Sequence, residues 1–146
     1  MTMNLIPGVE STGSALSAEK IRLEVIAQNI ANSNTTQDAS GKVYQRKEVA
    51  FEEFIKTPGR RTPGYVDENL YQGVRVVDVY DDQTPGRMIF NPGHPHANKV
   101  GMVEMPNVGV SREMIDLISA SRAYEANLSV VKTSRRMAQQ ALAIGR

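Results

Sequence analysis

The chain has 146 residues, with 17 basic and 16 acidic side chains and a formal net charge of +1. That charge is too small for the long-range field that gathers nucleic acid or anionic lipid, so the sequence predicts neither partner. The absence of cysteine excludes disulfides, thiolate metal sites and cysteine nucleophiles. The longest apolar run, Ala141 to Ile144, is far below the roughly 20 residues that cross a bilayer, and residues 1–10 lack the core of a Sec-type signal peptide.

The first predicted element is a helix from Val9 to Asn32. Aliphatic residues recur along it every seven positions, which is the pattern of a helix seam. They are Val9, Leu16, Leu23 and Ile30. The polar run from Asn32 to Thr36 is typical of a helix end, because its side chains compete for backbone hydrogen bonds.

The middle of the chain is predicted to be a small β-rich insert. Four short runs rich in strand formers are separated by glycine and proline: Val43–Phe51, Gly73–Tyr80, Arg87–Phe90 and Val100–Met105. The turn-forming residues 81–86 predict a hairpin between the second run and the third. Residues 57–64 are expected to form an exposed loop.

The last predicted element is a helix from Arg112 to Ile144. Its seam positions alternate between spacings of three and four, apart from a basic interruption at Arg135. They are Met114, Leu117, Ser121, Tyr124, Leu128, Val131, Ala138 and Leu142. Ser111 is the expected N-cap, and Glu113 suits the positive end of the helix dipole.

These elements predict an elongated α+β fold in which the two long terminal helices pair as a coiled-coil-like bundle. The expected division is a helical segment at 1–36, a central β-rich segment with loops at 37–107, and a C-terminal helical segment at 108–146. The terminal segments would form one discontinuous helical domain, and the central segment would be an insert in it.

A second apolar group on the first helix points to assembly. Ala18, Ile21 and Val25 lie roughly 140 to 200° around the axis from Leu16 and Leu23. One partner helix cannot cover both faces, and the central segment has few large apolar residues, so we expect neighbouring subunits to cover the second face. The alternative is an autonomous antiparallel helix pair whose second face folds against the β-rich insert, and periodicity alone does not separate the two.

Several motifs resemble those of the flagellar axial proteins. The stretch RLEVIAQNIANSNTT at 22–36 is similar to the signature shared by rod, hook and hook-associated proteins. More discriminating are NPGHP at 91–95, MPNV at 105–108, MIDLISASRAYEAN at 114–127 and the ending ALAIGR at 141–146. They resemble the proximal-rod proteins of the flagellar basal body over nearly the whole chain. His96, which follows the NPGHP motif, and the longer Arg60–Arg61 loop depart from the family pattern.

The resemblance implies a structural, non-enzymatic subunit of the periplasmic rod, without a cofactor or small-molecule substrate. It implies export through the flagellar type III apparatus without a cleaved signal peptide. The implied partners are copies of this chain, other rod proteins, and adaptor proteins of the basal-body ring and export gate. We expect the assembly interface to be formed by Leu16, Ile21, Leu23, Val25, Ile26, Asn29, Ile30, Asn32, Met114, Leu117, Ile118, Tyr124, Leu128, Val131 and Leu142.

Other patterns favour surface chemistry over a reactive site. His94 and His96 lack a third ligand nearby, so a loop-shaping role is preferred to a zinc site. Asp81 and Asp82 precede a proline and a glycine, which favours a solvated turn over an acid–base pair. Ser119 and Ser121 lack a nearby histidine base, so the sequence does not support a serine nucleophile. The competing functional hypothesis is a soluble binding module that works through the central insert.

Overall fold

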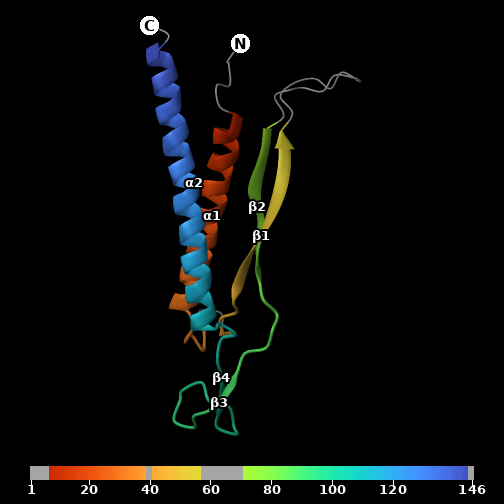
Figure 1. Ribbon diagram of the computed structural model, residues 1–146. Helices are drawn as coiled ribbons and strands as arrows, with labels where there is room; N and C mark the ends of the chain where they lie inside the picture. Colours follow the sequence, from red (N-terminus) through yellow and green to blue (C-terminus); the bar gives the residue numbers. More distant parts are fainter. Residues whose placement is uncertain (1–6, 39–40, 57–70, 145–146) are drawn as a thin grey trace, which may run out of the picture.

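A computed structural model describes residues 7–38, 41–56 and 71–144. Two long antiparallel helices lie side by side, and two small antiparallel sheets come between them in the sequence (Figure 1). Helix α1 spans Pro7–Ala31 and helix α2 spans Val110–Ile144, so their lengths are about 37 and 52 Å at 1.5 Å per residue. The predicted α+β class, with one long helix near each end of the chain, is confirmed. Within the described residues, neither helix combines the length and the apolar composition needed to cross a membrane.

Side chains close the end of α1 as its polar run predicts. The Asn32 side chain donates to the carbonyl of Gln28 at 2.9 Å, and the Ser33 hydroxyl donates to the carbonyl of Ile30 at 2.8 Å. Both carbonyls belong to the last turn, and each also accepts a backbone N–H, from Asn32 and from Ser33, so the side chains reinforce the helix end. Helix α2 begins at Val110, two residues before the predicted start at Arg112, so Ser111 lies inside its first turn and is not the N-cap.

Strand β1 (Lys47–Lys56) pairs antiparallel with β2 (Tyr71–Asp81), and β3 (Met88–Phe90) pairs antiparallel with β4 (Met102–Glu104). The β1–β2 hairpin contains a bulge after Ala50, where β2 has one extra residue. The predicted hairpin between β2 and β3 is wrong, because these strands belong to different sheets. The expected loop at 57–64 lies outside the described residues.

Hydrogen bonds around Asp82 explain why the chain does not reverse after β2. Its carboxylate accepts from the Thr84 backbone N–H and hydroxyl, and its backbone N–H donates to Arg46. The Asn107 side chain donates to the Asp82 carbonyl. These bonds hold the segment in an extended path from the first sheet to the second, so the turn-forming residues shape a crossing and not a hairpin.

The hairpin covers one side of α1, which corrects an expectation. Ala18 and Val25 are only 4% and 6% exposed within this single chain, although neighbouring subunits were expected to cover them. Both lie within about 40° of Ser14 on the helix, and the Ser14 hydroxyl accepts from the backbone N–H of Val74 in β2 at 3.1 Å. The alternative, in which the insert packs on the second face, therefore holds for these two residues. Ile21 stays exposed.

We expect Gly86→Ala to lower the free energy of unfolding by about 1–3 kcal/mol, because overpacking against rigid neighbours costs that much. The added Cβ would overlap the carbonyl oxygen of Met105, which is backbone. Urea unfolding measures the change. Gly13→Ala is the matched control, since nothing lies within 4 Å of its Cβ and alanine favours a helix over glycine by about 1 kcal/mol. Equal effects of the two substitutions would contradict the close approach.

Candidate functional site

Asn29, in the last turn of α1, is the centre of a buried polar cluster. Its side chain is 1% exposed and makes four hydrogen bonds. The amide nitrogen donates to the Lys47 carbonyl at 2.9 Å and to the Glu113 carboxylate at 3.0 Å. The amide oxygen accepts from the Lys47 N–H and the Tyr44 hydroxyl, both at 2.9 Å. These bonds use the two donors and two lone pairs of the amide, so the predicted interface residue Asn29 has no hydrogen-bonding capacity left for a neighbouring chain.

Glu113, in the first turn of α2, is fully buried as a carboxylate between two donors. One oxygen accepts from Asn29, and the other accepts from the Arg46 guanidinium at 2.6 Å. Arg46 also bonds Glu48 and lies 4.0 Å from Asp82. A buried charge is tolerated when it is paired and hydrogen-bonded, and the helix N-terminus adds partial positive charge near Glu113.

Asn107 forms a second amide bridge on the other side of the same backbone segment. Its oxygen accepts from the Arg46 N–H at 2.7 Å, and its nitrogen donates to the Asp82 carbonyl at 3.0 Å. The amide thus stands in for a strand residue between the start of β1 and the end of β2. The central polar cluster consists of Asn29, Tyr44, Arg46, Lys47, Asp82, Asn107 and Glu113.

The electrostatics of the cluster follow from these contacts. Burial by itself lowers the pKa of the Arg46 guanidinium, but the hydrogen bonds and charges of Glu113 and Glu48 outweigh it and raise that pKa. Hydrogen bonds from Thr84, followed by nearby arginine charges, hold the pKa of the Asp82 carboxyl below its usual value. Burial, followed by the charges of Asp81 and Glu113, raises the pKa of Tyr44. The cluster therefore favours charged arginine and aspartate beside neutral tyrosine.

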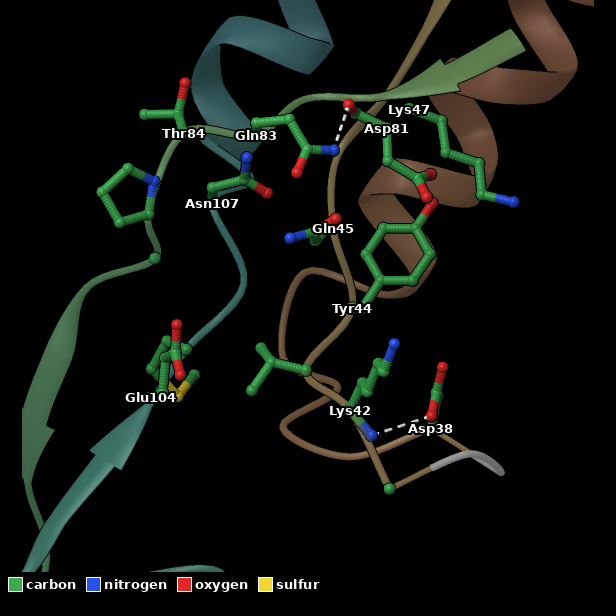
Figure 2. A pocket seen from close by; sticks show the side chains of 15 residues that line it. Asp38, Lys42, Tyr44, Gln45, Lys47, Asp81, Gln83, Thr84, Glu104 and Asn107 are labelled. Atoms are coloured by element: carbon green, nitrogen blue, oxygen red, sulfur yellow. Dashed lines mark hydrogen bonds between the residues drawn. The ribbon is translucent and has the colours of Figure 1, made fainter.

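An open pocket of about 790 Å³ lies next to the cluster, between the segment before β1, the end of β2 and the start of the chain after β4. Figure 2 shows basic, acidic and amide side chains around it, among them Lys42, Asp81 and Gln83. Across 7–38, 41–56 and 71–144, no group of three or more His, Cys, Asp and Glu side chains is placed to hold a metal ion. His94 and His96 stack edge to face with ring centroids 5.2 Å apart, and His96 bonds Thr36 at 2.8 Å.

The predicted interface residues divide into three groups by exposure. Buried inside the chain are Val25, Ile26 and Asn29. Half-buried are Leu16, Leu23, Ile30, Asn32, Leu117, Tyr124, Leu128 and Val131. Exposed are Ile21, Met114, Ile118 and Leu142. The exposed group is the part of the prediction that stays available to another chain.

Three exposed apolar residues gather on α2 in its first turns. Met114 and Ile118 are each 55% exposed, and Ile115 is also exposed. At 100° per residue they span an arc of about 100° on the side of α2 away from its buried residue Ala120. We call Met114, Ile115 and Ile118 the α2 apolar patch. Isolated exposed aliphatics are ordinary, but a group on one face of a helix suggests a contact surface.

Sequence reasoning missed the polar cluster. Glu113 was assigned only to the helix dipole and Asp82 only to a turn, and Arg46 was not singled out. One feature pointed to a buried role: Glu113 precedes Leu117, Ala120 and Tyr124 by steps of four, three and four along one helical stripe. A carboxylate on such a stripe requires a partner. The identity of that partner depends on residues far away in the sequence.

Comparison with family models finds two matches, one in each terminal region. Residues 10–37 match the model described as flagella basal body rod protein. Residues 99–144 match the model described as the C-terminal region of flagellar basal body rod FlgEFG proteins. These matches include α2, all of α1 except its first three residues, and the cluster residues Asn29, Asn107 and Glu113.

Curated relatives extend the likeness to almost the whole chain. The chain is 39% identical to the flagellar basal-body rod protein FlgC of Borreliella burgdorferi, over 97% of this chain and 98% of the relative. It is 40% identical to FlgC of Yersinia enterocolitica, with 98% and 99% covered. It is 32% identical to FlgC of Bacillus subtilis, with 99% and 100% covered.

We expect Asn29→Ala to lower the free energy of unfolding by about 2–4 kcal/mol, because it leaves a buried carboxylate and backbone groups without partners. Urea unfolding of the purified chain measures this change. The control is Asn32→Ala, which removes an exposed bond to the Gln28 carbonyl and a bond from the Thr35 hydroxyl and should cost less than about 1 kcal/mol. If Asn29→Ala lowered the free energy of unfolding no more than Asn32→Ala does, Asn29 would not be the centre of the cluster.

The raised pKa of Tyr44 predicts a loss of stability in alkaline solution. Because the folded chain holds this proton more tightly than the unfolded chain, the contribution is complete below the ordinary tyrosine pKa of 10.0. It is lost as the pH rises from there through the raised pKa. The unfolding free energy of the parent chain should therefore fall more steeply above pH 10.0 than that of Tyr44→Phe, in urea titrations at a series of pH values. Parallel curves would show that Tyr44 is not responsible.

Proposed function

The chain belongs to the family of the flagellar basal-body rod protein FlgC, and we propose that it is a structural subunit of the proximal part of that rod. It is a structural protein and not an enzyme, as are the rod proteins to which it is similar. The observation that carries this conclusion is likeness over nearly the full length of both chains, which includes the terminal helices and the segment between them.

We further propose that the subunit polymerises by packing of its helices. The α2 apolar patch supports this step, because each large aliphatic side chain left in water forgoes about 1.5–3 kcal/mol of burial. Leu142 is a further exposed aliphatic residue that a neighbouring chain could cover. It is 65% exposed in the last turn of α2, which is ten residues longer than α1 (35 against 25). Copies of this chain and other rod proteins are the partners that would cover these residues.

The arrangement of the two helices suits a tubular assembly. Along α2, half-buried and buried residues follow heptad spacing from Leu117 through Ala120, Tyr124 and Asn127 to Val131. This spacing supports a coiled-coil-like pairing of α1 with α2. The segments 1–36 and 108–146 would then act as one helical unit, and the segment 37–107 as its insert. Head-to-tail contacts between such units build an open helical filament when the rotation from one unit to the next does not close into a ring.

In this proposal the assembled helices form part of the drive shaft and of the export channel inside it. Interlocked side chains at native packing density resist sliding, so torque would pass through many helix contacts. Family membership also supports export by the flagellar type III apparatus and a place in the periplasmic rod. There the subunit would meet adaptor proteins of the basal-body ring and export gate.

Ile118→Asp tests the α2 apolar patch as an assembly surface. The residue is 55% exposed, so a charge there should change the stability of the isolated chain by less than about 0.5 kcal/mol. Buried against a neighbour, the same charge would be strongly unfavourable. We therefore expect Ile118→Asp to be absent from purified basal bodies and to abolish swimming, while Ile118→Val is incorporated and motile.

Unfolding curves of the two purified variants provide the control for folding. Normal incorporation of a folded Ile118→Asp chain would exclude the patch from the interface. Normal motility of a strain that lacks the chain altogether would exclude the rod function itself.

A further inference from the structure

Apart from its contact with Ala18 and Val25 of α1, the β1–β2 hairpin has little apolar packing to hold it in one direction. Four of its large apolar side chains are exposed: Phe51, Val74, Val77 and Val79. A two-stranded sheet is marginally stable by itself, so its position must come from what it is attached to. Figure 1 shows the hairpin rising beside α1 from the same end of the molecule at which α2 begins. The attachment at that end is the central polar cluster.

Two side-chain amides hold the base of the hairpin, one at Lys47 in β1 and one between Arg46 and Asp82. Asn29 bonds both the N–H and the carbonyl of Lys47, the first residue of β1. Asn107 spans the Arg46 N–H and the Asp82 carbonyl, where the strands come apart. An amide that pairs with backbone donor and acceptor together fixes orientation as well as distance, because the two bonds share one plane. The base of the hairpin therefore cannot turn unless an amide bridge breaks.

Glu113 connects these bridges to the second helix. Its two oxygens bond Asn29 of α1 and Arg46 of the hairpin base, and it is itself part of the rigid first turn of α2. We propose that the central polar cluster is a rigid joint that sets the direction of the β1–β2 hairpin relative to the α1–α2 pair. The role of Asn29, Asn107 and Glu113 is thus to position the hairpin, in addition to stabilising the fold.

The contact farther along the hairpin is of a different kind. There Gly73 approaches Ser14 so closely that an added Cβ would lie 2.8 Å from the Ser14 hydroxyl oxygen. One exposed hydrogen bond, from Val74 N–H to Ser14, accompanies this approach. A single bond to a rotatable hydroxyl restrains distance but not direction. The burial of Ala18 and Val25 against the hairpin is not directional either, so the joint at the base determines where the hairpin points.

In a rod subunit, a rigid joint would make the helix pair and the hairpin turn as one body. That consequence rests on the proposed function. The joint itself is a property of the single chain, so it is tested on the purified protein, and its failure would leave the rod function untouched.

The test is the distance distribution between two spin labels, measured by double electron–electron resonance. The chain has no cysteine, so Gln72→Cys on the hairpin and Ser129→Cys on α2 give two unique labels at exposed positions. We expect a single narrow distribution in this parent. Asn29→Leu removes all four bonds of the amide and should widen the distribution about twofold or more, as a locally released element samples more positions.

Two controls separate positioning from stability. Leu128→Ala weakens the fold at a half-buried residue of α2 away from the cluster, and its distribution should stay narrow. Ser14→Ala removes the distal bond and should also leave it narrow. Widening by Ser14→Ala as great as that by Asn29→Leu would overturn the proposal, and so would a narrow distribution in a folded Asn29→Leu chain.

If Asn29→Leu loses its helical circular dichroism, Asn107→Ala decides the matter. This variant leaves the Asn29 and Glu113 contacts and the direct bond from the Asp82 N–H to the Arg46 carbonyl in place, and removes only the two bonds of the Asn107 amide to Arg46 and Asp82. A widened distribution supports the joint, and an unchanged one overturns it.

Discussion

The buried carboxylate of Glu113 is the constraint on which the rest of the structure depends. A fully desolvated charge persists only if every nearby donor is in place, and here those donors come from Asn29 and Arg46, which are 84 and 67 residues away in the sequence. The end of α1, the start of β1 and the start of α2 must therefore meet at one point. Folding of any of these segments favours the folding of the others, since each alone would leave a polar group without a partner.

This convergence also determines which surfaces the chain covers by itself. With its base fixed, the hairpin lies along α1 and buries Ala18 and Val25. Helix α1 is thus flanked by α2 and by the hairpin, whereas α2 keeps an open face that carries Met114, Ile115 and Ile118. A rod subunit built in this way would offer α2, and not α1, as its principal apolar contact. The second apolar face of α1, on which the expectation of assembly was based, is largely buried within the chain itself.

The polar cluster and the apolar patch make complementary contributions to a structural protein. Hydrogen bonds are directional, so the cluster holds the helix pair and the hairpin in one arrangement. Apolar contact is not directional and tolerates many partners, so the patch suits packing against similar but not identical neighbours. A rod made of related subunits requires both: each chain must keep its own shape, and each must fit several kinds of neighbour.

The sequence by itself determined the two helices, the α+β class and the family. The reason is that heptad spacing, helix-stop residues and motifs are local features, legible within a few turns of chain. Only the tertiary structure decided that β2 pairs with β1 and not with β3, that the hairpin covers α1, and that Asn29 and Glu113 are internal partners. Strand pairing and burial of charge depend on which distant segments meet, and a residue such as Asp82 has the same sequence neighbours whether it turns the chain or carries it across to a second sheet.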